Sequence, residues 1–226
     1  THNTNYNSPR QVPGTTWASV PVNSANDANH SMAIKTDGTL WSWGYNYNGA
    51  LGNNEVAAPA GDPSNNNYSS PIQIPGTTWS NIAGHGSNYG ATVVKTDGTM
   101  WSWGYNSYGQ LGHNNRTNYS SPTQIPGTDW SAVAMNSAAA MAVKTNGTAW
   151  MMGSSEYGQL GLGHGDSSKS SPHQLPGTSW TSKISGGTGH FAAIRSDNTL
   201  WLLSLIHISE PTRLLSIGGG RVVGEK

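Results

Sequence analysis

The sequence predicts an all-β protein built from a repeated unit, and three observations support this. A ten-residue block beginning with SPRQVPGTTW at 8–17 returns at 70–79, 121–130 and 171–180. A second block, KTDGTLW at 35–41, returns at 95–101, 144–150 and 195–201. Between the blocks lie short β-prone runs separated by turn residues, without a sustained 3.6-residue apolar period. A period of about 50 residues with four short strands per unit is typical of a blade of a β-propeller.

Each unit is expected to contain four strands. They are the SPxQI run, a run that begins with Trp (WSNIA), a run that ends in Lys or Arg (ATVVK) and the TxWxW run (TMWSW). A two-residue turn joins the last two runs, at Asp37-Gly38, Asp97-Gly98, Asn146-Gly147 and, in a weaker version, Asp197-Asn198. Asp or Asn followed by Gly favours a type I′ hairpin, because both turn residues need a positive φ.

The repeats divide the chain of 226 residues. Propeller repeats are expected over 1–203, with repeat 1 at 8–69 carrying an insertion at 53–69, repeat 2 at 70–120, repeat 3 at 121–170 and an incomplete repeat 4 at 171–203. Residues 204–226 break the pattern and turn to Leu, Ile, Arg and Glu. This tail resembles translated adapter read-through at the end of a metagenomic gene, and we expect it to be non-native. Because the chain lacks an initiator Met and opens in mid-repeat, we also expect a fragment of a longer protein.

The combined motifs resemble the regulator of chromosome condensation repeat. The resemblance rests on KTDGTxW, on WSWGYNSYGQLG at 101–112 and on SSPxQIPG, and it covers 1–203. It implies a β-propeller of four-stranded antiparallel blades, here about four blades as a partial arc of an expected seven. Family members often carry a His before the third strand. That slot holds His30, Gly90, Ala139 and His190, so a shared ring of catalytic histidines is not expected.

Composition excludes several function classes. Lys+Arg and Asp+Glu are both 11, and charged residues are 10% of the chain against a typical value of about 25%. The basic footprint of a nucleic-acid-binding protein is therefore absent. No run approaches the roughly 20 apolar residues of a membrane span, and the absence of Cys excludes disulfides and thiol catalysis. The eight His residues lack metal-ligand spacing, so no metal, cofactor or enzymatic activity is expected.

The four copies separate packing positions from variable ones. Trp17, Trp79, Trp130 and Trp180 fill one slot, and Trp41, Trp101, Trp150 and Trp201 fill another. A third slot accepts Trp43, Trp103, Met152 or Leu203, which indicates a need for apolar volume rather than for a stacking ring. Length varies in two loops per unit, one before the Lys-ended run and one after the LG pair. In an antiparallel meander these loops share one end of the blade, and the PGT and DG turns share the other.

The end with the variable loops is the candidate binding surface, because binding residues concentrate on loops held by a rigid scaffold. Tyr and Asn are suitable contact residues, since Tyr gives rigid area and Asn adaptable hydrogen bonds. The candidate interaction residues are Asn26, Asp27, Asn29, Tyr45, Tyr47, His85, Asn88, Tyr89, Tyr105, Tyr108, Asn136, Glu156 and Tyr157. The alternative for each residue is a role in building a turn or an inter-blade contact.

The favoured function is a non-enzymatic module that presents these loops to a protein partner within a larger bacterial or phage surface protein. An extracellular, cell-surface or virion location is weakly favoured. The alternative is a glycan-binding adhesin, which requires tyrosine rings with an open face beside Asn or Asp. A guanine-nucleotide exchange factor, a role found in the family, is the less favoured alternative. Because a partial arc leaves apolar faces and unpaired strand edges at both ends, self-association through open blade edges is also expected.

Overall fold

The structure is a computed structural model that describes residues 8–20, 30–56, 66–84, 90–156, 158–163, 167–187 and 189–204. The described residues form four antiparallel sheets, three with four strands and a last one with three. The first sheet contains β1 (Trp17–Ser19), β2 (His30–Lys35), β3 (Leu40–Gly44) and β4 (Tyr68–Ile74). The second contains β5 (Trp79–Gly84), β6 (Gly90–Lys95), β7 (Met100–Gly104) and β8 (Tyr119–Ile125). The third contains β9 (Trp130–Met135), β10 (Ala139–Lys144), β11 (Ala149–Gly153) and β12 (Lys169–Gln174), and the fourth contains β13 (Trp180–Gly186), β14 (His190–Arg195) and β15 (Leu200–Ser204).

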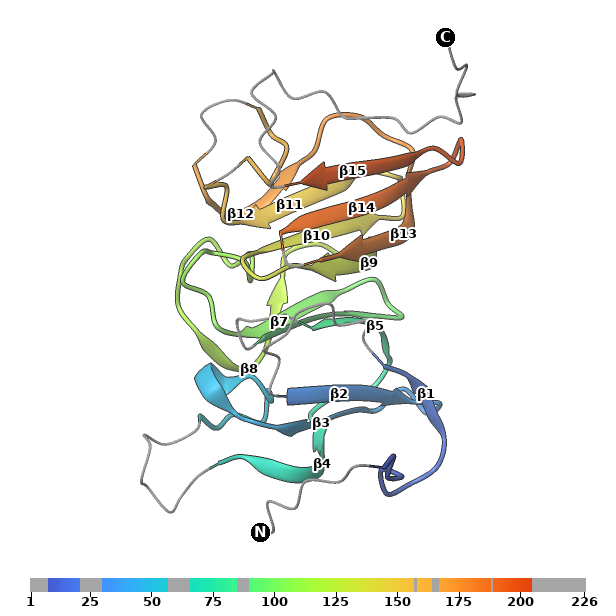
Figure 1. Ribbon diagram of the computed structural model, residues 1–226, viewed down its shortest axis with the longest axis vertical. Coiled ribbons are helices and arrows are strands. Elements are labelled where there is room, and N and C mark those ends of the chain that lie inside the picture. Colours follow the sequence, from blue (N-terminus) through green and yellow to red (C-terminus); the bar gives the residue numbers. More distant parts are fainter. Residues whose placement is uncertain are drawn as a thin grey trace, which may run out of the picture.

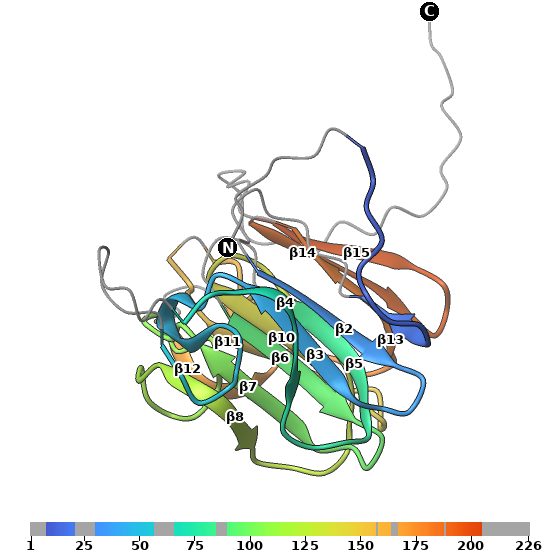
Figure 2. The same ribbon diagram turned by 90° about the horizontal axis from the view of Figure 1, so that it is seen from below.

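The first sheet lies at the bottom of Figure 1, the second lies above it, and the third and fourth overlap one another in the upper part of the view. Seen along that axis, the strands of successive sheets overlap in projection (Figure 2). The first strands of the second and third sheets contact one another. The backbone amide of Val133 on β9 donates to Oδ1 of Asn81 on β5 at 3.3 Å. Sheets that stack face to face in this way form an open arc of propeller blades, as the sequence predicts.

The blades are shifted by one strand from the sequence repeats. The SPxQI run was expected to open each unit, whereas the structure pairs it with the last strand of the preceding unit. Gln73 on β4 pairs with Trp41, and Gln124 on β8 pairs with Trp101. Each blade therefore begins at the Trp-led strand and ends with the next SPxQI run. The first copy of that run, at 8–14, lies exposed and outside any strand.

The hairpin turns differ from the predicted type I′ geometry. In the hairpin turn of the first blade, residues 36–39, only Gly38 has a positive φ, at 78°, and its backbone amide donates to the carbonyl of Lys35 at 2.9 Å. The loop is thus a three-residue connection that ends in a left-handed residue. Asp37 keeps an ordinary φ because its Oδ1 accepts both the amide, at 2.9 Å, and the hydroxyl, at 2.7 Å, of Thr39. In the fourth blade Asn198 takes the left-handed position, with φ 64°.

The turn end and the loop end are separate, as the predicted meander requires. At the turn end, the amide of Trp79 donates to the carbonyl of Gly38 at 3.0 Å, so a PGT turn lies against the hairpin turn of the preceding blade. At the loop end, the amide of Asn54 donates to the carbonyl of Ser120 at 2.8 Å. The first blade is therefore fastened to the second at both ends, and the amide of Asn114, which donates to the carbonyl of Ser170 at 2.6 Å, repeats the loop-end contact between the second and third blades.

The hydrophobic core lies between the sheets and consists of three clusters. Each cluster packs aliphatic side chains of one blade against aromatic or aliphatic side chains of the next. Between the first two blades, Ile34, Leu40 and Ile74 meet Trp79 and Trp103. The Trp slots are therefore packing positions, as predicted. Among the residues that the structure describes, no helix is long and apolar enough to cross a membrane.

Candidate functional site

The predicted surface begins with the loop that follows the third strand of each blade. In the second blade the buried side chain of Asn106 organises this loop. Its Oδ1 accepts the amide of Leu111 at 3.0 Å, and its Nδ2 donates to the carbonyls of Asn115 at 3.1 Å and Thr117 at 3.0 Å. A side-chain amide that satisfies several backbone groups at once fixes the loop in one shape.

Asn46 has the same role in the first blade. Its Oδ1 accepts the amide of Leu51, and its Nδ2 donates to Oδ1 of Asn53 and to the carbonyl of Glu55, all at 3.0 Å. Glu55 is further tied to the end of the loop, since its Oε2 accepts the hydroxyl of Tyr68 at 2.8 Å. These contacts leave the tyrosines on either side of Asn46 as the outward-facing residues.

Close backbone contacts hold these loops against the neighbouring blade. A Cβ placed on Gly49 would lie 2.5 Å from Cα of Ser120, and one placed on Gly109 would lie 2.6 Å from Cα of Ser170. Any side chain at either position would force the loop away from the next sheet. The loop end is consequently a rigid platform that crosses from blade to blade.

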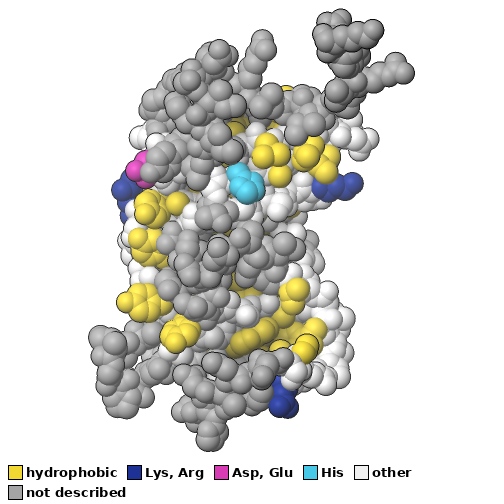
Figure 3. Space-filling view, in the orientation of Figure 1, with side chains coloured by type: hydrophobic (Ala, Val, Ile, Leu, Met, Phe, Trp, Pro, Cys, Tyr) yellow, Lys and Arg dark blue, Asp and Glu magenta, His cyan; other side chains and the backbone are white. Residues whose placement is uncertain are grey.

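Tyrosine side chains project from this platform. Tyr45 is 53% exposed, Tyr47 is 58% exposed and Tyr108 is 38% exposed. Tyr105 is half-buried and meets Tyr108 edge-on, with 6.2 Å between the ring centroids. Apolar and aromatic side chains line the same edge of the space-filling view (Figure 3), where Figure 1 places the 3₁₀ turn η1 (Tyr47–Gly49) and β8. We call Tyr45, Tyr47, Tyr105 and Tyr108 the tyrosine surface.

The tyrosine surface spans two blades. Nδ2 of Asn118, at the end of the second loop, donates to Oδ1 of Asn48 at 3.1 Å. Asn48 lies inside η1 with φ 54°, directly after Tyr47. The first and second loops are therefore joined through their own polar side chains.

The remaining candidates divide into three groups. Glu156 is exposed on the corresponding loop of the third blade. Asn136 was expected at the surface but is buried, because its Oδ1 accepts the amides of Ala138 at 2.9 Å and Ala139 at 2.7 Å and so builds a turn. The others lie outside the described residues, namely Asn26, Asp27, Asn29, His85, Asn88, Tyr89 and Tyr157.

Sequence reasoning missed a regular feature at the turn end. The basic residue before each hairpin turn contacts both Trp rings of its blade, which meet edge-on, with Nζ of Lys95 at 4.4 Å and 4.8 Å from the ring centroids of Trp79 and Trp101. The same contacts join Lys35 with Trp17 and Trp41, Lys144 with Trp130 and Trp150, and Arg195 with Trp180 and Trp201. Such cation–π contacts stabilise the blade. The signal was present in the sequence as a basic residue in all four copies.

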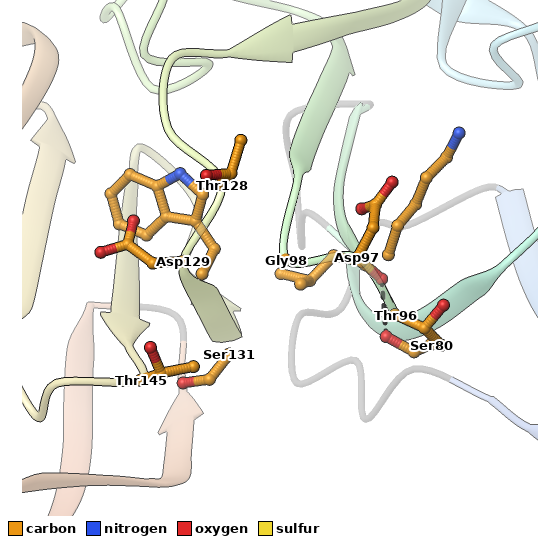
Figure 4. Close-up of a pocket in the computed structure, with 11 residues that line it drawn as sticks. Ser80, Thr96, Asp97, Gly98, Thr128, Asp129, Ser131 and Thr145 are labelled. Atoms are coloured by element: carbon orange, nitrogen blue, oxygen red, sulfur yellow. Dashed lines mark hydrogen bonds between the residues drawn. The ribbon is translucent and has the colours of Figure 1, made fainter.

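A polar hollow of about 410 Å³ opens at the turn end between the second and third blades. Asp97 and Thr96 lie on one side of it and Asp129 and Thr145 on the other (Figure 4). Asp129 is paired with Lys144, with 3.0 Å between Oδ1 and Nζ. Hydrogen bonds from Thr99, first from its hydroxyl and then from its amide, lower the pKa of the Asp97 carboxyl. Both acids thus already have partners within the turn end.

Two histidines are perturbed by burial. Burial lowers the pKa of His30 to about 4, since the charged ring would lie without solvent at the start of β2. Burial also lowers the pKa of His113, whose Nε2 lies 2.9 Å from Oγ of Ser102. Within the described part of the chain no group of three or more His, Asp or Glu residues is placed to hold a metal ion.

The comparisons with known proteins agree with this architecture. Models of the regulator of chromosome condensation (RCC1) repeat match residues 24–50, 97–141 and 146–194. The Ultraviolet-B receptor UVR8 of Arabidopsis thaliana is 33% identical over 176 residues, which cover 76% of this chain and 38% of that protein. Protein RCC2 of Homo sapiens is 36% identical over 107 residues, which cover 46% of this chain and 19% of that protein.

Solved structures share the fold at lower identity. Human WBSCR16 superposes with a TM-score of 0.66 at 23% identity, covering 81% of this chain and 47% of that one. Prp20p of Saccharomyces cerevisiae superposes with a TM-score of 0.69 at 17% identity, covering 86% of this chain and 47% of that one. The chain thus spans less than half the length of these relatives. The repeat motifs, the stacked four-stranded sheets and the matching family models together show that the chain belongs to the family of regulator of chromosome condensation repeat proteins.

Proposed function

We propose that this chain is a non-enzymatic propeller module that recognises a protein partner through its loop end, as part of a larger bacterial or phage surface protein. The observation that carries the proposal is the tyrosine surface. Its exposed rings stand on a platform fixed by Asn46, Asn106 and the inter-blade contacts. Rigid aromatic side chains bind with little loss of conformational entropy, which is why they are frequent in recognition surfaces.

The relatives support a binding role. The solved structure of Prp20p is described together with its binding to Gsp1p and histones, and another structure shows yeast RCC1 (Prp20) bound to Kap60. These partners belong to Prp20p. For this chain they support the general expectation of a protein partner, since sites rather than folds determine function.

Site-specific photo-crosslinking tests the proposal. A photoreactive benzoylphenylalanine replaces Tyr47 at the loop end or, as a matched control, the exposed Thr77 at the turn end. We expect covalent adducts between position 47 and a partner protein, and an excess of the unmodified chain should suppress them. Few adducts are expected from position 77. Equal adduct yields at the two positions would contradict recognition through the loop end.

Glycan binding is the second candidate, favoured by the exposed ring of Tyr47 beside the polar pair Asn48 and Asn118. Aromatic faces next to amide groups suit the apolar and hydroxyl faces of a sugar. A glycan array probed with the wild type and with Tyr47→Ala separates the candidates. Signals that depend on Tyr47 would favour the adhesin, whereas a blank array with protein adducts at position 47 would favour the protein partner.

A further inference from the structure

The sequence contains two Asn-Gly pairs, Asn48-Gly49 and Asn146-Gly147. In such a pair the backbone nitrogen of the glycine can attack the side-chain carbonyl carbon of the asparagine, because glycine has no Cβ that would shield its nitrogen. The asparagine then loses ammonia, which makes it one of the thermolabile residues of proteins. Asn48 lies in η1 at the loop end, and Asn146 lies in the hairpin turn between β10 and β11. Their surroundings therefore decide which pair reacts in the folded chain.

The first pair is held against the second blade. Asn48 is half-buried and Gly49 is buried, and a Cβ placed on Gly49 would lie 2.5 Å from Cα of Ser120. The side chain of Asn48 is also engaged, since its Oδ1 accepts a hydrogen bond from Nδ2 of Asn118 at 3.1 Å. Closing a ring between Asn48 and the nitrogen of Gly49 requires their shared peptide group to rotate, and this rotation would lift the loop off the neighbouring sheet. The contact between the blades thus protects Asn48.

The second pair lies open at the turn end. Asn146 is exposed and Gly147 is half-buried, and the atom nearest to a Cβ placed on Gly147 would be the amide nitrogen of Ser179, at 3.2 Å. The amide of Gly147 donates to a carbonyl of its own turn, that of Lys144, at 2.9 Å. The amide of Gly49 also donates within its own turn, so this bond does not distinguish the two pairs. Exposure and the weaker packing of Gly147 therefore single out Asn146 as the reactive residue.

An aspartate fits the turn of the third blade without any change. The other three hairpin turns carry Asp at this position, namely Asp37, Asp97 and Asp197. In each of them Oδ1 accepts the amide and the hydroxyl of the Thr two positions later, at 2.6 to 3.0 Å. Oδ1 of Asn146 accepts the same two groups of Thr148 at 3.1 Å and 2.7 Å. Isoaspartate would instead add a methylene group to the backbone of the connection, so the turn geometry suits aspartate and not isoaspartate.

The contacts of Thr148 also decide how the intermediate opens. Ring closure gives a cyclic imide, in which water can attack either the former side-chain carbon, giving aspartate, or the backbone carbonyl carbon, giving isoaspartate. Negative charge develops on the oxygen of whichever carbonyl is attacked. The amide and hydroxyl of Thr148 lie beside the side-chain oxygen, where they would stabilise that charge. Attack at the side-chain carbon is therefore favoured in the folded turn.

We infer that Asn146 is a site of spontaneous deamidation, at which the folded chain replaces the asparagine by aspartate rather than by isoaspartate. The nitrogen of Gly147 bonds to Cγ of Asn146, the Cγ–Nδ2 bond breaks, and ammonia leaves with the proton of the glycine amide. Water then adds to Cγ, the bond from Cγ to the glycine nitrogen breaks, and that nitrogen regains a proton. The reaction consumes water and releases ammonia. It adds a negative charge to a chain whose formal net charge is zero, so the third blade acquires the charged turn of the other three.

Ageing of the full chain at mildly alkaline pH tests the inference. Trypsin cleavage after Lys144 and Lys169 releases residues 145–169, in which Asn146 is the only asparagine. Mass spectrometry of this peptide and of the peptide that contains Asn48 measures both conversions, and electron-transfer fragmentation distinguishes aspartate from isoaspartate. We expect Asn146 to convert at least about tenfold faster than Asn48, because only Asn48 requires a local opening between two blades. Aspartate should be the main product at position 146.

Two matched controls connect the outcome to the folded turn. In the same chain unfolded in urea, both pairs should convert at similar rates and isoaspartate should predominate. In the folded chain, Thr148→Val removes the hydroxyl donor and should shift the product towards isoaspartate, whereas Thr148→Ser keeps the donor and should keep aspartate. Equal rates for the two pairs in the folded chain, or isoaspartate as its main product at position 146, would overturn the inference. So would an intact Asn146 in the folded chain under conditions in which the unfolded chain converts.

Discussion

The second and third blades share their strands and their packing, yet they differ at the residue that organises the loop after the third strand. In the second blade Asn106 uses both of its side-chain polar atoms to hold three backbone groups. In the third blade the same position is Ser155, whose buried hydroxyl has no hydrogen-bond partner in the described part of the chain. The loop of the second blade is thus held by side-chain hydrogen bonds that the third blade lacks, although both blades have the same strands. The strands of a blade therefore form independently of how its loop is held.

The largest expected effect comes from removing those hydrogen bonds. Asn106→Ala leaves the buried amide of Leu111 and the carbonyls of Asn115 and Thr117 without their side-chain partner, so the free energy of unfolding should fall by about 3 kcal/mol. Urea denaturation measures the loss. Ser155→Ala is the matched control in the third blade, and it should not destabilise the chain, because the Ser155 hydroxyl holds no backbone group. Equal losses for the two variants would mean that the two loops are held in the same way.

A second difference between the two blades lies in the core. Thr92 on β6 occupies the slot that Met141 fills on β10, and its buried hydroxyl has no partner among the described residues. Thr92→Val should therefore stabilise the chain by about 1 kcal/mol, because it removes an unsatisfied polar group at constant shape.

The control for this variant is Thr99→Val. The Thr99 hydroxyl donates to Asp97 and accepts the indole N–H of Trp101, so its removal should destabilise the chain by about 1 kcal/mol. Thermal unfolding measures both changes, and the melting temperature should rise for Thr92→Val and fall for Thr99→Val. A loss of stability for Thr92→Val would show that its hydroxyl is satisfied in solution.

These contrasts indicate which parts of the structure the sequence could predict. The repeat period and the turn residues predicted four-stranded blades. These signals are local, because a Gly at a left-handed turn position and alternating apolar residues each depend on only a few neighbouring residues. The pairing of the SPxQI run with the preceding unit was not predicted, since the phase of a repeat depends on contacts between strands that are distant in sequence. The contact of Lys95 with the rings of Trp79 and Trp101 had a signal in the sequence, a basic residue in every copy, but its geometry requires three strands in register.

The candidate surface was predicted in part. Tyr47 and Tyr108 are exposed at the loop end, as the variable loop lengths suggested. Asn136 was placed on the same surface but is buried, because an Asn next to a tight turn satisfies backbone amides as readily as it faces a ligand. Composition cannot distinguish these two roles. The distinction depends on whether backbone groups within reach already have partners.

A smaller difference between the two blades is an ion pair at the turn end. Asp129 pairs with Lys144 in the third blade, and the position of Asp129 is Thr78 in the second. Asp129 is 42% exposed, so Asp129→Thr should cost no more than about 0.5 kcal/mol. The difference from the wild type should disappear in 1 M salt, where the screening length is about 3 Å. A loss that persists at high salt would indicate packing rather than charge.

The smallest expected effect separates the two hairpin turns by pH. Asp97 in the second blade and Asn146 in the third hold the same two hydrogen bonds to the following Thr, but only Asp97 titrates. Because those bonds favour the ionised carboxylate, they lower its pKa in the folded chain below the ordinary value of 3.8. The stabilisation is therefore fully present above pH 3.8 and is lost as the pH falls through the lowered pKa of the folded state.

Asp97→Asn should keep the turn while removing this part of the acid sensitivity, and Asn146→Asp should add the same sensitivity to the third blade. Unfolding midpoints measured for the three chains between about pH 2 and 6 give the comparison, since the pH dependence follows from the difference in bound protons between the folded and unfolded chains. The wild type should lie between the two variants in its acid slope, because the turns of the first and fourth blades titrate equally in all three. Identical slopes would mean that the Thr99 hydroxyl donates equally well to a neutral side chain and that the charge of Asp97 adds nothing to the turn.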